Sequence, residues 1–394
     1  MRTYTVRDFT LLKKLQARLQ HYDCNGIAHL KNLKHCMARS HSARGVTISK
    51  TSDGKVGVQG LTYCHNSWAC PSCAPYQMNR IKQKLTLAFA MMKERGYRCR
   101  MVTFTVPHAR LSDGTFMKLD DIFYLLRNVY NSCLSGTMKH VRSTDSRTFS
   151  IFEITWSPIN GWHPHIHALY WLKPDDMDKF IAAEKRLQES WKVHCEKILK
   201  QMTWLSQNEY NRFYNCLQKG FSKGVFISDH DADTSNYFWS GENEVADLLK
   251  KTAKTHHLTS WQILARALDN DDKLYWNLYI EMIKAVRAVQ HWRFKRGFLS
   301  EINEYEKDHP IEKIEKKKQQ PEKEAKTVCW FTREQWNYNN IICPHFLPLI
   351  ASFVAACEVD EAFNLICELC TVYRQPPPLK ESPLENNSQI GAAA

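Results

Sequence analysis

The sequence predicts an α+β fold, in which an antiparallel sheet with flanking helices follows a zinc-binding segment and precedes a small helical module. Three observations lead to this prediction. Residues 150–172 read as a β-hairpin with one apolar face, residues 64–73 hold three closely spaced cysteines, and apolar residues recur at helical spacing beyond residue 328.

The hairpin lies in the segment "SIFEITWSPINGWHPHIHALYWL". Two runs rich in aromatic and β-branched residues, 151–156 and 165–172, flank the turn signal "SPING". Successive side chains of a strand point to opposite faces of its sheet, so one face of the hairpin is apolar and suited to a covering layer of helices. That face carries Phe152, Ile154, Trp156, Ile166, Ala168 and Tyr170.

The other face of the hairpin carries Glu153 and Thr155 on the first strand and His165 and His167 on the second. If the turn is centred near residue 159 or 160, Glu153 lies across from one of the two histidines, with Cβ atoms roughly 5 Å apart. Two imidazoles and a carboxylate suit a divalent cation that keeps open positions for substrate oxygens. The alternative is a set of surface histidines, or of core histidines with hydrogen-bond partners.

Length and composition indicate a globular protein. The chain has 394 residues, 43% hydrophobic and 24% charged, which is enough for one large domain or two to three modest ones. No apolar run approaches the ~20 residues that cross a bilayer, and the N-terminus lacks the apolar core of a signal peptide, so a cytoplasmic location is expected. The net charge of +13 indicates an anionic partner, usually nucleic acid, although acidic proteins and membrane surfaces are also anionic.

Composition divides the chain into five segments. Residues 1–94 hold the cysteine cluster and residues 95–300 the hairpin with its helices. Residues 301–327 are mostly Glu, Lys, Gln and Pro, cannot bury a core, and are expected to form a partly helical linker or a solvated helix. Residues 328–374 resume helical apolar spacing, and residues 375–394 form a tail expected to be disordered.

The cysteine cluster predicts a structural Zn²⁺ site, because thiols in a reducing compartment form metal clusters rather than disulfides. In "CPSC", Cys70 and Cys73 have the spacing with which two thiolates hold one tetrahedral zinc. Cys64 supplies a third ligand and Cys36 is the expected fourth. The less favoured substitutes are Cys24 and His65. A redox pair is the alternative, but no thioredoxin-like βαβ pattern surrounds the motif.

Three motifs follow one another in a specific order: "MVTFTVPHAR", "EITWSPINGWHPHIHALYWL" and a tyrosine-bearing helix. This order resembles that of HUH endonucleases, and specifically of the rolling-circle replication initiator (Rep) proteins of small bacterial plasmids. "GLTYCHNSWACPSC" is similar to the Cys-rich N-terminal segment of that family, and "LTSWQILARAL" and "FTREQWN" are similar to its later parts. The resemblance covers roughly residues 36–350.

The resemblance implies a metal-bearing strand at the centre of an antiparallel sheet and a tyrosine that attacks a DNA phosphodiester. It places this nucleophile at Tyr237, after an Asp/Thr/Ser stretch suited to a helix start. The family commonly has a lysine three residues later, where this chain has Ser240, and Lys250 or Lys251 could substitute. An alternative alignment on "NEVADLLKK" puts Leu248 at the nucleophile position and implies an inactive enzyme, but it makes the "LTSWQIL" spacing less natural.

Further residues are assigned from the same resemblance. Some Rep proteins have an acid one helical turn before the tyrosine that activates water to end a replication round, and Asp233 has this position, although it equally suits a helix cap. Thr103 and Thr105 share a strand face as scaffold, and His108 is expected near the DNA. His163, directly before Pro164 at the strand entrance, is expected to orient the loop, contact DNA or act as an alternative ligand.

The basic segment "KAVRAVQHWRFKRGF" is expected to follow the DNA backbone through Arg293, Lys295 and Arg296. Trp292 and Phe294 are available for base stacking, with core packing of a helix as the alternative.

The function that the resemblance implies is initiation of plasmid rolling-circle replication in the bacterial cytoplasm. The protein would nick single-stranded origin DNA with Mg²⁺ or Mn²⁺ held by Glu153, His165 and His167, leaving a 5′-phosphotyrosyl bond and a free 3′-OH primer. The expected partners are plasmid origin DNA and the host helicase and DNA polymerase, without a membrane; the oligomeric state is not predicted. The alternatives are a transposase or relaxase of the same superfamily, or a catalytically inactive, zinc-stabilised DNA-binding regulator.

Overall fold

The computed structural model divides the chain into two compact units, Met1–Gln77 with Lys318–Ala394, and Met78–Lys317. The residues that the structure describes are 2–20, 28–40, 43, 45–107, 115–139, 146–218, 224–230, 257–287, 289–310, 325–343, 345–372 and 378–380. The predicted residues outside these ranges are Tyr237, Asp233, His108, Cys24, Ser240, Leu248, Lys250 and Lys251.

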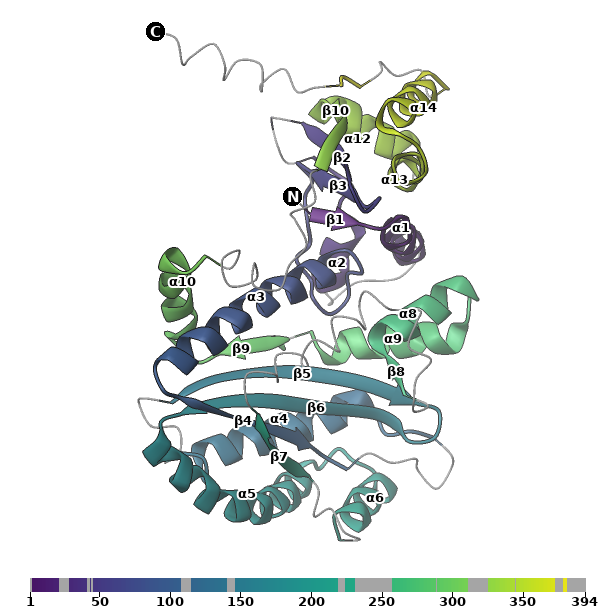
Figure 1. Ribbon diagram of the computed structural model, residues 1–394. Coiled ribbons are helices and arrows are strands. Elements are labelled where there is room, and N and C mark those ends of the chain that lie inside the picture. Colours follow the sequence, from purple (N-terminus) through teal and green to yellow (C-terminus); the bar gives the residue numbers. More distant parts are fainter. Residues whose placement is uncertain are drawn as a thin grey trace. The chain divides into compact units, whose positions relative to one another are not determined.

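The first unit is built on an antiparallel sheet with the strand order β1-β3-β2-β10 (Figure 1). Its strands are β1 (Arg2–Tyr4), β2 (Val46–Thr51), β3 (Val56–Gln59) and β10 (Ala325–Phe331). Its helices are α1 (Val6–Gln20), α2 (Ala28–Lys34), α12 (Arg333–Ile342), α13 (Phe346–Ala356) and α14 (Val359–Val372). Helix α1 packs against α13, and α13 against α14.

Strand β10 brings the C-terminal segment into the sheet of the N-terminal segment. It pairs with β2 from Ala325↔Thr51 to Phe331↔Val46, and its register shifts at a bulge between Thr327 and Cys329. Helices α12 to α14 agree with the predicted helical spacing. Strand β10 lies in the sheet of the N-terminal segment, and residues 328–374 belong to the same compact unit as that segment.

The described strands of the second unit form an antiparallel sheet with the order β7-β4-β6-β5-β8, and β9 also pairs with β5. These strands are β4 (Arg98–Thr105), β5 (Arg147–Ser157), β6 (Gly161–Leu172), β7 (Val225–His230), β8 (Leu258–Thr259) and β9 (Trp292–Phe294). The predicted α+β class with antiparallel strands and flanking helices is confirmed. Strand β6 lies between β4 and β5, at the central place that the resemblance implies for the metal-bearing strand.

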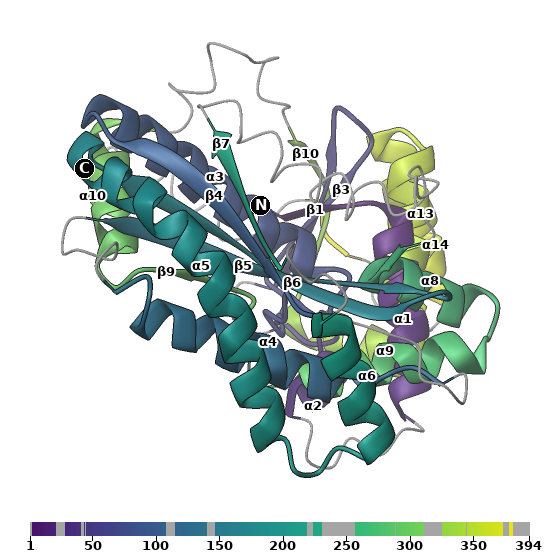
Figure 2. The same ribbon diagram turned by 90° about the horizontal axis from the view of Figure 1, so that it is seen from below.

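Helices cover both faces of this sheet (Figures 1 and 2). They are α3 (Cys73–Glu94, which begins in the first unit), α4 (Leu119–Ser135), α5 (Pro174–Gln201), α6 (Gln207–Gln218), α8 (Ser260–Asp269), α9 (Lys273–Ala285) and α10 (Phe298–Asp308). Helices α3 and α10 share a core cluster with Phe149, Leu169 and Trp171. On the opposite side, α5 packs Phe180 against Tyr170, with ring centroids 5.6 Å apart.

The hairpin of β5 and β6 has the predicted register, with Glu153 directly opposite His165. Both strands are longer than predicted, so His163 and Pro164 lie inside β6 rather than at its entrance. Strand β4 pairs with β6 only as far as Thr105↔His165, so beyond this point β6 has no β4 partner. The missing N–H of Pro164 therefore breaks no ladder bond on that side, which explains how the strand tolerates a proline.

None of the helices in the described ranges is both long and apolar enough to span a membrane.

Candidate functional site

The predicted cation ligands meet on one face of the sheet in the second unit, which we call the histidine face. Oε2 of Glu153 lies 2.8 Å from Nε2 of His165 and 3.1 Å from Nε2 of His167. One ligand atom from each residue lies within 4.8 Å of the others. The two imidazoles are mostly buried, but the Glu153 side chain is 42% exposed. This combination of fixed nitrogen ligands and an accessible carboxylate suits a divalent cation that also contacts a substrate oxygen.

The charge states of these residues also suit a cation. Desolvation would raise the pKa of Glu153, but the charge and hydrogen bonds of His165 and His167 outweigh it and hold that pKa well below its usual value. Burial lowers the pKa of His167 below 6.5, against the opposing effect of the Glu153 carboxylate. At neutral pH the carboxylate is therefore ionised and the His167 ring neutral, which are the forms that bind metal.

Cation affinity should fall in acid solution, because a proton on Nε2 of His167 competes with the cation. The lowered pKa of His167 means that this ring protonates only below the ordinary histidine value of 6.5. We expect Mn²⁺ affinity to stay level down to that pH and then to fall by up to about tenfold per pH unit for each proton displaced. Calorimetric Mn²⁺ titrations across the pH range would measure this, and a fall that begins well above 6.5 would contradict it.

Thr103 on β4 fixes the orientation of one imidazole. Its Oγ1 lies 2.8 Å from Nδ1 of His167, to which it is directly opposite in the sheet. A cation at Nε2 requires the ring proton on Nδ1, and the Thr103 hydroxyl can accept that proton in a hydrogen bond. The sequence suggested Thr103 as scaffold only, whereas the structure gives it this specific contact.

Thr103→Val should weaken Mn²⁺ binding by about 10–100-fold, because valine keeps the shape of the side chain but removes the acceptor for Nδ1–H. The matched control is Thr148→Val, which makes the same substitution on β5 away from the site. Isothermal calorimetry of both variants measures the effect. Equal affinities in the two variants would show that the Thr103 hydroxyl does not orient the ring.

Two more histidines extend the site. Nε2 of His163 lies 3.2 Å from Oγ1 of Thr105, and its ring centroid lies 5.2 Å from that of His165. On the other side, the ring of His257 lies 6.0 Å from that of His163. Sequence reasoning missed His257. Its only sequence signal is its position directly before "LTSW", where β8 begins and pairs with β5.

The predicted basic DNA contacts lie on and after β9. Arg293 and Arg296 are exposed, whereas Nζ of Lys295 donates a hydrogen bond of 2.8 Å to the carbonyl oxygen of Ser146. Phe294 is 8% exposed and its ring lies 4.8 Å from that of Phe149, which favours core packing over base stacking. DNA contact by the three cations stays a prediction.

The four predicted zinc ligands come together in the first unit. Sγ of Cys36 lies 3.6 Å from Sγ of both Cys70 and Cys73, and Sγ of Cys64 lies 3.8 Å from Sγ of Cys73. Four thiolates around one tetrahedral zinc, each about 2.3 Å from the metal, are separated by about 3.8 Å. The separations are too long for disulfides, whose sulfur atoms lie about 2.05 Å apart. The cluster therefore fits a structural metal.

Hydrogen bonds hold this cluster in place. The backbone N–H of Cys73 donates to Sγ of Cys70 over 3.3 Å, and the buried Gln16 side chain donates to the carbonyl oxygens of Leu33 and Cys36. Desolvation raises the pKa of the fully buried Cys70 thiol. Because thiolates bind zinc and thiols do not, metal binding at this position must displace protons.

Comparison with known proteins gives two curated matches. A Streptomyces lividans protein named "Protein rep" is 30% identical over 32% of this chain and 33% of its own length. A Streptomyces cyanogenus protein named "Neomycin resistance protein" is 27% identical over 32% of this chain and 34% of its own length. These matches support the interpretation of this chain as a plasmid Rep protein. The chain spans about a third of the length of each of these relatives, no protein-family model matches it, and no solved structure gives a significant match.

Proposed function

We propose that this protein initiates rolling-circle replication of a plasmid by nicking its origin as an HUH endonuclease. The observation that carries the proposal is the convergence of Glu153, His165 and His167 through a single carboxylate oxygen on the face of an antiparallel sheet. The order of the sequence motifs, the net charge of +13 and the similarity to a protein named "Protein rep" support it.

The three residues would hold Mg²⁺ or Mn²⁺, and such a cation supplies Lewis acidity and charge neutralisation at the scissile phosphate. The protein's own part is to present a neutral His167 nitrogen, the Nε2 of His165 and an ionised carboxylate. Thr103 fixes the His167 tautomer, and the exposed edge of Glu153 leaves room for DNA. The cysteine cluster, in which three of the four residues are buried, would hold Zn²⁺ with a structural role, because four protein ligands leave no open position for a substrate.

Tyr237 is the proposed nucleophile. Its phenolic oxygen gives up its proton and forms a bond to the scissile phosphorus while the bond from phosphorus to the 3′ oxygen breaks. The 5′ phosphate stays attached to the tyrosine, and the departing oxygen takes up a proton to become a free 3′-OH. Host polymerase would extend that primer after host helicase opens the duplex. Water activated by Asp233, or a second nucleophile, would end the round.

The decisive experiment incubates the protein with supercoiled plasmid carrying its origin, with Mg²⁺ or Mn²⁺ and with chelator. We expect an open-circular product and, after denaturing electrophoresis, DNA covalently attached to protein, both of which require the cation. A plasmid lacking the origin is the control. Tight origin binding without any nicking would instead favour the inactive regulator, and nicking that persists in chelator would contradict the cation's role.

A further inference from the structure

The histidine face continues beyond the proposed cation ligands toward the hairpin turn. The ring centroid of His163 lies 5.2 Å from that of His165, and the ring centroid of His257 lies 6.0 Å from that of His163. With His167, whose ring centroid lies 4.7 Å from that of His165, these rings form a row of four. Two of the four are the proposed cation ligands, and His257 has no part in the proposed reaction.

Sheet pairing places this end of the row. Strand β8 pairs with the end of β5 next to the hairpin turn, where Thr259 lies opposite Thr155 (Figure 1). On the other side of β5, Thr155 lies opposite His163. Residues directly opposite one another in a sheet share a face. Thr155 and Thr259 therefore lie on the histidine face, next to the two outer rings.

The surface formed by these residues is polar and accessible. His163, His257, Thr155 and Thr259 are all half-buried, so each keeps part of its surface exposed. The ring of His163 is held in place, because its Nε2 lies 3.2 Å from Oγ1 of the buried Thr105. The outer ring of His257 packs against this fixed ring.

The surroundings of His257 indicate which of its nitrogens offers a proton. Its Nδ1 is buried and has no hydrogen-bond partner among the residues that the structure describes. A buried N–H without an acceptor is a rarer arrangement than a buried acceptor without a donor. The ring proton therefore belongs on Nε2, and a ligand at this surface meets an N–H donor.

The start of α8 adds to the donors beside His257. Thr259 is the N-cap of this helix, and its Oγ1 accepts a hydrogen bond of 3.3 Å from the backbone N–H of Gln262. The Thr259 hydroxyl still has its own proton to donate. The N-terminal end of a helix also carries a partial positive charge, which favours an anion nearby.

The chemistry of these groups defines the ligand. The imidazole of His257 and the hydroxyls of Thr155 and Thr259 all donate, so the ligand is an acceptor. Within the described ranges, no further Cys, His, Asp or Glu joins His163 and His257 in a cation-binding group. A second divalent cation therefore fits poorly. A phosphate of a DNA strand fits well, because it presents several anionic oxygens to donors on more than one strand of the sheet.

We propose that His257, with the hydroxyls of Thr155 and Thr259, binds the DNA phosphate next to the scissile one. The inference rests on the proposed function, which places the scissile phosphate at the cation site. Successive phosphates of a strand are only a few ångströms apart, and the ring of His163 alone separates His165 from His257. Two phosphate contacts would fix the direction in which the strand crosses the histidine face.

The test measures binding of labelled heptathymidylate by fluorescence anisotropy, with either phosphodiester or uncharged methylphosphonate linkages. We expect His257→Ala to weaken binding of the phosphodiester strand by about tenfold, because a hydrogen bond to a charged group is lost. The methylphosphonate strand should lose less than about twofold, since its linkages carry no charge. Equal losses on both strands would assign His257 to a base or a sugar and overturn the proposal.

His257→Gln is the second variant. Its NH₂ group can donate from about the position of Nε2, so it should keep most of the affinity that His257→Ala loses. The matched control is His194→Ala, which removes a half-buried histidine from α5 and should bind both strands as the wild type does. A loss in His257→Gln as large as in His257→Ala would contradict a donor role for this residue.

Two further measurements separate the phosphate site from other readings. Calorimetry should show the same Mn²⁺ affinity in His257→Ala and wild type, and a large fall would assign His257 to the cation site instead. Inorganic phosphate at the concentration of the strand should not displace the heptathymidylate. Displacement would assign the surface to a free anion and overturn the assignment to DNA.

The binding assay involves no cleavage, so its result is separable from that of the nicking experiment. A protein that nicks its origin but loses no phosphate-dependent affinity in His257→Ala would refute this inference alone. A protein that shows the phosphate-dependent loss but never nicks would refute the proposed function alone.

Discussion

Tyr237→Phe should abolish covalent attachment to origin DNA and lower the nicking rate by roughly 10⁴-fold or more, because phenylalanine has no oxygen to attack phosphorus. Cation affinity and origin binding should not change, since Glu153, His165 and His167 remain. Nicking is measured as conversion of supercoiled to open-circular plasmid, and attachment as radiolabelled DNA that migrates with the protein in denaturing electrophoresis.

The control for this substitution is Tyr210→Phe, which removes a hydroxyl from α6 and should leave nicking at the wild-type rate. Unchanged nicking by Tyr237→Phe would refute the assignment of the nucleophile. In that case the alignment that puts Leu248 at the nucleophile position would not rescue the mechanism, because leucine cannot attack. Another tyrosine would then have to be found by mapping the attached peptide.

The hairpin shows what local sequence can predict. Period-two alternation separates Glu153, His165 and His167 from the apolar positions, and a turn centred on residue 159 sets Glu153 opposite His165. Both signals are contained within 23 consecutive residues, 150–172. Sequence reasoning could therefore predict the candidate cation ligands and their register without knowledge of the rest of the fold.

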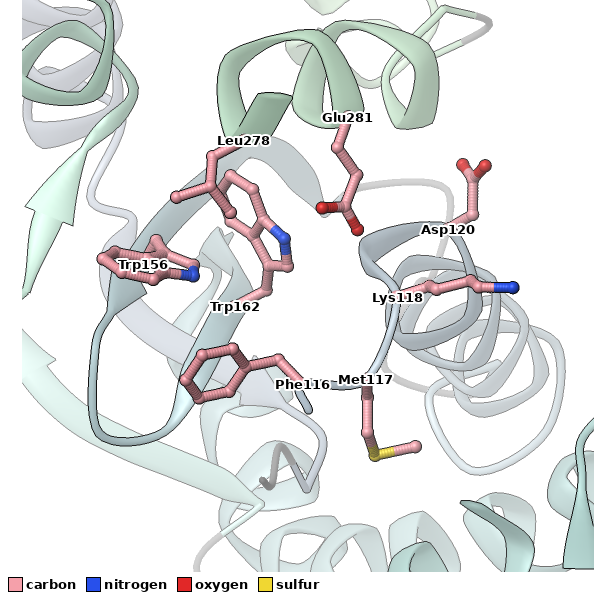
Figure 3. Close-up of a pocket in the computed structure, with 8 residues that line it drawn as sticks. All are labelled: Phe116, Met117, Lys118, Asp120, Trp156, Trp162, Leu278 and Glu281. Atoms are coloured by element: carbon pink, nitrogen blue, oxygen red, sulfur yellow. The ribbon is translucent and has the colours of Figure 1, made fainter. Parts of the chain in front are cut away.

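The parts that escaped prediction depend on contacts between distant segments. Strand β10 carries "AKTVCWF", and nothing in these residues indicates that their partner is β2 in the N-terminal segment. His257 reaches the histidine face only because β8 pairs with β5. Glu281 (Figure 3) accepts a hydrogen bond from the backbone N–H of Leu119 because α9 packs against α4. A single sequence carries no information on which distant segments pair.

The start of β6 was also predicted wrongly from the sequence. A proline normally excludes a central strand position, so the sequence suggested that the strand begins after Pro164. The structure continues β6 back to Gly161 because β4 has already ended and only β5 remains as partner. The prediction that His163 lies at the strand entrance was therefore wrong. Its side chain nevertheless lies on the histidine face, beside Thr105.

Cys70→Ser should destabilise the first unit by at least about 4 kcal/mol, because a bound structural zinc contributes its binding free energy to folding and serine oxygen is a poor replacement for a thiolate. Cys70 is fully buried and adjoins Cys36, so the substitution also leaves a hydroxyl among thiols. Urea unfolding followed by tryptophan fluorescence measures the loss, and elemental analysis measures zinc per chain.

The matched control is Cys357→Ser, which changes a partly exposed cysteine of the same unit at the end of α13 and should cost less than about 1 kcal/mol. Wild-type protein treated with chelator should behave like Cys70→Ser if the metal is the cause. Full zinc content and unchanged stability in Cys70→Ser would exclude a Cys₄ site. The cluster and the histidine face lie in different units. Zinc loss should therefore unfold the first unit while Mn²⁺ still binds to the second, which would separate the two proposed metal sites.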